Sequence, residues 1–194
     1  MALKEYPVTG EKTDSNLRVD YEEVLNLKET YKFMREWLNF EGYADGDTEQ
    51  LMEKFYLERV TQGGAKEMWI WWRVEKSPTT KYFKRKLNID MHVLGMKDIE
   101  IMHKGNKIKA QRGEFECFVN GVLEFDPKSE LPKVPIFGAF VDLFRKRTYL
   151  ADIERERLHF RDDCLRLQGA LKQFLELRGF LPESEMFQSP RGLG

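Results

Sequence analysis

The sequence lacks the features of a membrane or secreted protein. Its 194 residues contain no uncharged apolar run of about 18 residues, so no membrane span is expected. Residues 1–7 hold no apolar core of the length found in signal peptides. Cysteine is scarce, and Cys117 and Cys164 lie far apart in no metal-ligand spacing. We therefore expect a cytoplasmic protein whose two thiols are reduced and act as small buried hydrophobes.

Catalytic and cofactor-binding motifs are absent as well. The glycines at 42–46 and 63–64 match neither phosphate-binding fingerprint. Asp162 and Asp163 are adjacent on a predicted helix, where neighbouring side chains diverge by about 100°. We therefore predict no enzyme activity and no cofactor, which leaves hypotheses about binding.

Asp90, His92 and His103 are the residues that come nearest to a metal site. Asp90 and His92 share one face of a predicted strand, where the predicted register places His92 opposite Asp98. The same register points His103 to the other face. Ligands on opposite faces cannot converge on one ion, so no metal site is predicted.

What the sequence does contain is a concentration of aromatic residues, because three of its four tryptophans lie in the run 67–74. This run follows Gly63 and Gly64 and a second β-prone run, 55–60, which together predict a tight hairpin. If the two glycines form the loop, Phe55 lies opposite Trp72. Side chains alternate along a strand. One face then carries Phe55, Leu57, Met68, Ile70, Trp72 and Val74, and the other carries Tyr56, Trp69 and Trp71.

Periodicity along the rest of the chain predicts a single α+β domain over residues 20–180. A composition of 41% hydrophobic and 34% charged residues suits such a domain. The expected order begins with a flexible tail (1–19), an N-terminal helix (20–42) and a bent antiparallel meander of about five strands (52–126). One short and one long C-terminal helix (136–178) and a disordered end (181–194) follow.

Glycines mark two irregularities inside the predicted meander. Alternation over 81–93 places apolar side chains inward with one misfit, Arg85. The hydrophobic pattern favours a three-residue loop at 94–96 before the next strand. The inward phase then slips by one residue at Gly113, which predicts a β-bulge there.

Charge is distributed unevenly along the chain. Residues 20–62 hold 11 acidic and 5 basic side chains, whereas residues 63–113 hold 5 acidic and 12 basic ones. A basic stripe of this kind is able to attract nucleic acid or an acidic membrane surface. The alternative is that the two segments neutralise each other within one fold.

The order of the predicted elements resembles a group of small uncharacterised archaeal α+β proteins. The residues that carry the resemblance are aromatic and glycine positions at 31–38, 42–43 and 95–101, Gly105, Gly113 and the segment 135–147. It covers roughly residues 27–178. The resemblance implies one helix, an antiparallel sheet and long C-terminal helices, and it implies no activity and no site residue.

The aromatic face of the predicted hairpin supports three interpretations. The first is a core face covered by the long helix at 149–177, because apolar faces are normally buried. The second is a stacking platform for single-stranded nucleic acid, although no RNP-type motif is present. The third is a cavity for a hydrophobic ligand, as in helix-grip folds. The candidate binding face comprises Tyr56, Trp69, Trp71, Arg73, Lys84 and Lys86.

The segment 136–147 combines four large apolar residues with three consecutive basic ones. It suits either a helix packed on the sheet or contact with a membrane interface. From all these features we predict a non-catalytic binding or assembly module whose partner is a protein or a second copy of the chain. A small hydrophobic-ligand carrier and a nucleic-acid-binding protein are the alternatives.

Overall fold

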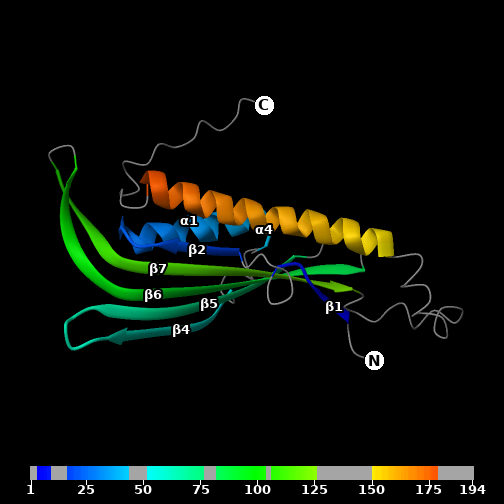
Figure 1. Cartoon of the computed structure of the whole chain (residues 1–194), viewed down its shortest axis with the longest axis horizontal. Helices are drawn as coiled ribbons and strands as arrows, with labels where there is room; N and C mark the ends of the chain where they lie inside the picture. The colour runs from blue at the N-terminus through cyan, green and yellow to red at the C-terminus, as the bar shows by residue number, and fades with distance from the viewer. Residues whose placement is uncertain are drawn as a thin grey trace, which may run out of the picture.

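The computed structural model describes residues 4–9, 17–43, 52–76, 82–103, 106–125 and 150–178. Seven strands and two helices lie within these ranges (Figure 1). In chain order they are β1 (Lys4–Pro7), β2 (Leu17–Tyr21), β3 (Val24–Leu25), α1 (Leu27–Phe40), β4 (Glu53–Val60), β5 (Lys66–Lys76), β6 (Phe83–His103), β7 (Asn106–Phe125) and α4 (Leu150–Arg178). The predicted α+β class is confirmed.

The described strands pair antiparallel in a single sheet. β4, β5, β6 and β7 are neighbours in chain order, and β1, β2 and β3 all pair along the remaining edge of β7. The sheet therefore has seven strands, and the predicted meander of about five strands is wrong in number. The meander itself has four long strands, and the N-terminal segment supplies three short ones.

The N-terminal strands replace elements that the sequence predicted differently. Residues 1–19, predicted to be a flexible tail, contribute β1 and the start of β2, and Val8 and Val19 are buried in the core. The helix predicted over 20–42 begins only at Leu27, because the residues before it pair with β7. Its start is marked by Asn26, whose side chain accepts a hydrogen bond from a backbone N–H in the first turn, a standard N-cap.

β6 and β7 form one long hairpin, so the predicted loop at 94–96 is wrong. β6 continues through it, and Gly95 and Met96 together stand opposite Gly113. The bulge therefore lies in β6, with Gly95 in the left-handed region at φ +60°. A Cβ atom on Gly113 would come within 2.8 Å of the Leu94 carbonyl oxygen, so glycine at this position makes room for the bulged strand.

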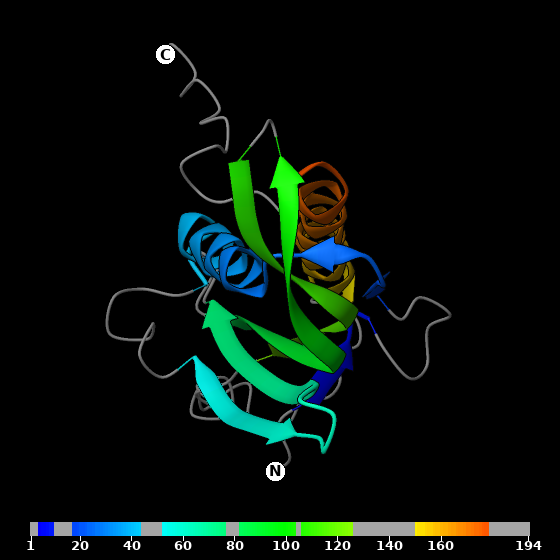
Figure 2. The same cartoon turned by 90° about the vertical axis from the view of Figure 1, so that its left-hand side faces the viewer.

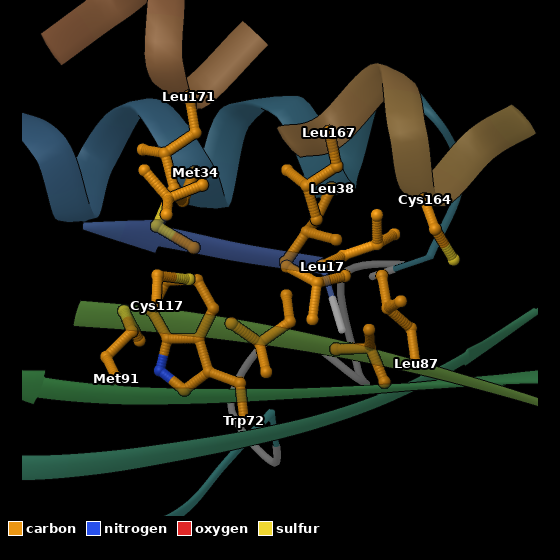
Figure 3. Packing of buried hydrophobic residues seen from close by; sticks show 14 of the residues in the cluster. Leu17, Met34, Leu38, Trp72, Leu87, Met91, Cys117, Cys164, Leu167 and Leu171 are labelled. Carbon is orange, nitrogen blue, oxygen red and sulfur yellow. The ribbon is translucent and has the colours of Figure 1, made fainter. Parts of the chain in front are cut away.

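α1 and α4 lie side by side over one face of the sheet, here called the inner face (Figures 1 and 2). Phe33 of α1 stacks on Phe174 of α4 with ring centroids 4.4 Å apart. The core between helices and sheet is apolar and includes Trp72, which has no exposed surface (Figure 3). Met68, Ile70, Trp72 and Val74, predicted to share one face of β5, do share it and are all buried.

Gly121 in β7 lies against α4, where there is no room for a side chain. A Cβ atom there would meet the Cys164 sulfur at 2.9 Å and the ring of Phe160 at 3.2 Å. Ile153, Phe160 and Leu167, which are spaced seven residues apart along α4, are all buried. The helix is thus aligned along the sheet by its own apolar seam.

The predicted short helix at 136–147 and the predicted disordered end at 181–194 lie outside the described residues. Neither α1 nor α4, the helices within the described ranges, is long and apolar enough to cross a membrane.

Candidate interaction face

The hairpin of β4 and β5 is present, but its register differs by one residue from the prediction. Phe55 lies opposite Trp71 and Leu57 opposite Trp69, and five residues, 61–65, connect the strands. The Thr61 backbone N–H and hydroxyl both donate to the Ala65 carbonyl oxygen, at 2.8 and 3.0 Å, and so close the longer loop. A one-residue slip moves every side chain of a strand to the other face.

In the observed register, an apolar cluster forms on the face of the sheet opposite the helices, here called the outer face. The cluster comprises Phe55, Leu57, Trp69 and Trp71, and we refer to it as the outer apolar patch. Phe55 stacks on Trp71 with centroids 4.4 Å apart, and Trp69 stacks on His92 at 4.9 Å. Trp71 is 41% exposed and Leu57 47% exposed. No described helix covers this face (Figures 1 and 2), so the prediction that helix 149–177 buries it is wrong.

β4, which carries Phe55 and Leu57 of this patch, is an edge strand, and all eight of its residues are exposed. Among the described strands it pairs only with β5. Because the Thr61 N–H points toward β5, the alternation of an antiparallel ladder also turns the backbone groups of Arg59, Leu57 and Phe55 toward β5. The N–H and C=O groups of Tyr56 and Glu58 therefore point to the open edge.

The basic residues of the predicted binding face do lie on the outer face, but each has an acidic partner. Arg73 is 2.6 Å from Asp90, and Lys84 is 2.7 Å from Glu75. Lys86 bridges Glu5 and Glu124, at 3.0 and 3.1 Å. These acidic partners lie in β1, β5, β6 and β7, and none belongs to the acidic segment 20–62, so these cations are neutralised by neighbouring strands rather than by that segment.

Tyr56 is the one residue of the predicted binding face that lies on the other side of the sheet. Its hydroxyl donates to Glu58 at 2.8 Å. Burial, followed by that carboxylate, raises the pKa of Tyr56 to about 12. Tyr56 also borders a half-open pocket of about 260 Å3 between α1, the hairpin and the β6 bulge. The pocket is lined by Leu27, Lys28, Tyr31, Tyr56, Glu58, Lys66, Met68, Ile70, Met96, Asp98 and Gln111.

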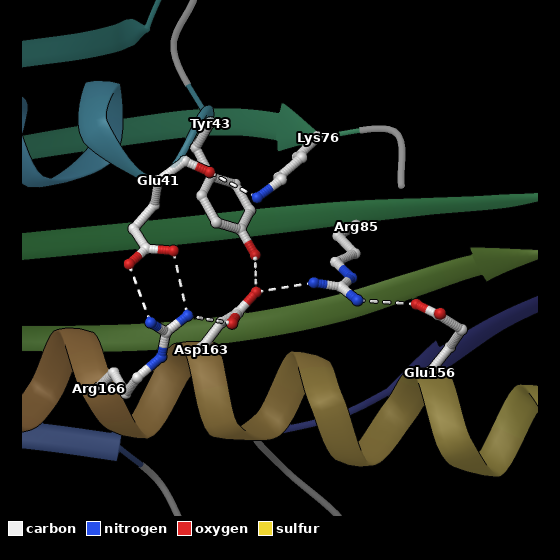
Figure 4. A network of polar contacts seen from close by, with 7 residues as sticks. All are labelled: Glu41, Tyr43, Lys76, Arg85, Glu156, Asp163 and Arg166. Atoms are coloured by element: carbon white, nitrogen blue, oxygen red, sulfur yellow. Dashed lines mark hydrogen bonds and ion pairs between the residues drawn. The ribbon is translucent and has the colours of Figure 1, made fainter. Parts of the chain in front are cut away.

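Arg85, the misfit of the predicted inner face, belongs to a polar network beneath α4 (Figure 4). Its guanidinium donates to Asp163 and to Glu156, each at 2.8 Å. Asp163 also accepts from the Tyr43 hydroxyl at 2.9 Å and from Arg166 at 2.6 Å. Arg166 in turn makes two 3.0 Å hydrogen bonds to the carboxylate of Glu41, just after α1, so the network joins both helices to the sheet (Figure 4).

The charge of Asp163 is maintained by its partners. Burial alone would raise the pKa of this carboxyl, but hydrogen bonds from Arg166 and Tyr43 and the charge of Arg85 hold the pKa below its usual value. Asp163 and Glu156 therefore face the sheet and belong to the packed interior of the fold. The missed signal was an arginine in the inward phase of a strand, together with two acids seven residues apart on a helix.

Neither thiol has the environment of a nucleophile. Cys117 and Cys164 are buried without a disulfide, and burial raises the pKa of both, that of Cys164 to about 12. In the part of the chain that the structure describes, no three His, Cys, Asp or Glu residues gather as metal ligands. His92 lies between Glu67 and Glu116, at 3.4 and 3.5 Å, rather than beside Asp98 as predicted.

No family model, curated protein or solved structure matches this chain. The resemblance to archaeal α+β proteins therefore stays a prediction, and the function has to be argued from the geometry of the chain itself.

Proposed function

We propose that the protein is a non-catalytic binding and assembly module that engages another polypeptide through β4 and the outer apolar patch. The observation that carries the proposal is an eight-residue edge strand, exposed along its whole length, that borders two stacked and exposed aromatic rings. Exposed apolar patches and open strand edges are the surfaces that soluble proteins use for association.

The two parts of this surface complement each other energetically. The open edge offers backbone hydrogen bonds, which supply affinity to an added strand with little dependence on its sequence. Phe55 and Trp71 supply apolar area and a fixed ring geometry, because each ring holds the other in place. Tryptophan and other aromatic residues are enriched among the side chains that carry most of the binding energy in interfaces.

The nucleic-acid hypothesis finds less support on this face. A surface that binds phosphates needs cations that lose few existing ion pairs when they contact the phosphates. Arg73, Lys84 and Lys86 each lie within 3.1 Å of a carboxylate, so binding a phosphate would break existing ion pairs.

The ligand-carrier hypothesis has one observation in its favour, the pocket beside Tyr56. Met68, Ile70 and Met96 give it apolar walls, and charged residues also line it. Its volume of about 260 Å3 lies below the 300–1,000 Å3 typical of small-molecule sites, and it is half open. We therefore rank it second.

Photo-crosslinking tests the proposed module. The full chain would carry p-benzoylphenylalanine in place of Leu57, on the patch, or in place of Leu158, which is 59% exposed on α4 and serves as the matched control. We expect illumination in cells of the source organism to give a protease-sensitive adduct from position 57 and little from position 158. Equal adducts from both positions would contradict the proposal, and an adduct sensitive to nuclease would favour the nucleic-acid hypothesis.

A further inference from the structure

We propose that the partner is a second copy of this chain, and that the two β4 strands pair antiparallel with Tyr56 opposite Tyr56 of the second copy. This inference rests on the proposed function, and it names both the partner and the register. The result would be a two-fold symmetric dimer in which the two sheets continue into each other.

The backbone limits which registers are available. Because Tyr56 and Glu58 direct their N–H and C=O groups to the open edge, an antiparallel partner must also present outward-directed residues opposite them. Two identical strands therefore pair with their centre at Tyr56, at Leu57 or at Glu58. Pairings that set an outward-directed residue against an inward-directed one form no ladder.

Side-chain chemistry selects among these centres. β4 is regular from Phe55 to Val60, and Lys54 is the extra residue of an irregularity just before this stretch. A centre at Tyr56 sets Phe55 opposite Leu57 twice, and it brings Lys54 toward Glu58 twice, so apolar side chains meet and unlike charges approach each other. A centre at Leu57 would set Phe55 opposite Arg59. A centre at Glu58 would place two carboxylates opposite each other, which is destabilising.

The Tyr56 centre also unites the two outer apolar patches. Phe55 and Leu57 share the outer face with Trp71 and Trp69, their partners on β5. Across the new strand pair, Phe55 and Leu57 of one copy lie beside Leu57 and Phe55 of the other. One apolar ribbon then runs across four strands, and the open edge of each β4 is used up, so the assembly closes at two copies.

Sedimentation velocity of the purified full chain provides the first test. We expect a concentration-dependent monomer–dimer equilibrium in the wild type. Lys54→Glu and Glu58→Lys should each weaken dimerisation by roughly tenfold, because each brings like charges toward each other twice. The double variant K54E/E58K should recover most of the lost dimer affinity. Only in the proposed register do residues 54 and 58 of the two copies approach each other, so only there does the exchange restore pairs of unlike charge. Circular dichroism checks that each variant folds, since Glu58 also contacts Lys66.

A disulfide-trapping experiment tests the register independently. Tyr56→Cys should form a covalent dimer with copper phenanthroline, because residues opposite each other in such a pair have Cα atoms about 5.5 Å apart. Val60→Cys is the matched control, since the proposed register separates the two copies of Val60 by about eight residues. The native thiols are buried and do not compete.

Each outcome decides between the proposals. A wild type that stays monomeric up to its solubility limit overturns self-pairing, and if position 57 still crosslinks to a different polypeptide, the binding module stands. A dimer that ignores the charge exchange, or that traps equally well through Val60→Cys, overturns the register. No dimer and no crosslink would remove both proposals.

Discussion

Trp71 and Trp72 are consecutive residues of one strand with opposite environments. Trp72 is fully buried beneath α1 and packs edge-on against Tyr31, with ring centroids 4.7 Å apart. Trp71 is 41% exposed on the outer face and contacts mainly Phe55 and the guanidinium of Arg73. The same residue type serves as core on one face and as accessible surface on the other. The difference lies in what covers each face.

The two faces also differ in how their charged side chains are paired. On the inner face, Arg85 is held by two carboxylates of α4, and its side chain is only 12% exposed. On the outer face, Arg73 is paired with Asp90 of the neighbouring strand and remains partly exposed. A buried charge needs its partners to remain stable, whereas an exposed pair contributes little. Variants on the two faces should therefore differ strongly in their effect on stability.

The largest expected effect is that of Trp72→Ala. Truncating a fully buried large aromatic side chain costs about 3–5 kcal/mol of unfolding free energy through lost contacts and a cavity. Urea denaturation followed by circular dichroism measures the change. Trp71→Ala, one residue away, is the matched control, and equal losses for the two variants would contradict the assignment of inner and outer faces.

A smaller loss is expected from Asp163→Asn. The variant keeps an acceptor for Tyr43 but removes the charge that Arg85 and Arg166 contact, which should cost about 2–3 kcal/mol at neutral pH. Asp162→Asn, at the exposed neighbouring position, should cost far less. Similar midpoints for the two variants would show that the network under α4 contributes little.

The effect of Asp163→Asn should also depend on pH. The folded-state pKa of Asp163 is depressed, so its contribution is present above the unfolded value of about 3.9 and is lost as pH falls through the lower folded-state pKa. The difference in stability between wild type and variant should therefore shrink in acid. A difference that stays constant from neutral pH to acid would contradict this account.

The smallest effect is expected from Trp71→Ala. Losing one exposed cross-strand contact should cost about 1 kcal/mol. In a double-mutant cycle, Trp71 and Phe55 should couple by about 0.5–1.5 kcal/mol, because their rings stack. Trp71 and Phe174 should be additive, since Phe174 packs against Phe33 under the other face. Coupling between Trp71 and Phe174 would restore the buried interpretation of the patch.

Local alternation was enough to predict which residues of β5 share a face and which residues of β6 point inward. It could not set the register of β4, because both phases of that strand are apolar: Phe55 and Leu57 in one, Tyr56 and Val60 in the other. The register depends instead on the hydrogen bonds that close the loop at Thr61. A hydrophobic pattern specifies register only where one phase is clearly polar.

Long-range pairing accounts for the other failures. β1 and β2 pair with β7, a partner about a hundred residues away, and nothing in their short sequences identifies it. The pairing of Arg85 with Asp163 likewise spans 78 residues. Of the predicted binding face, five residues share the outer face and Tyr56 does not. Phe55 and Leu57 were not predicted to belong to this face, because the predicted register of β4 was wrong by one residue and so placed both side chains on the opposite face.

The position of β7 between β6 and the N-terminal strands imposes an order on folding during synthesis. Val19 pairs with Cys117, so the ribosome must add 98 residues before the partner of β2 exists. At about 5–20 residues per second, β1 and β2 wait roughly 5–20 s after they are made. The β6–β7 hairpin, by contrast, begins at the close pair His103 and Asn106 and pairs consecutive strands, so it can form as β7 is made. The first strands to be synthesised are therefore among the last to join the sheet, and until then their apolar residues lack the partner strand that buries them.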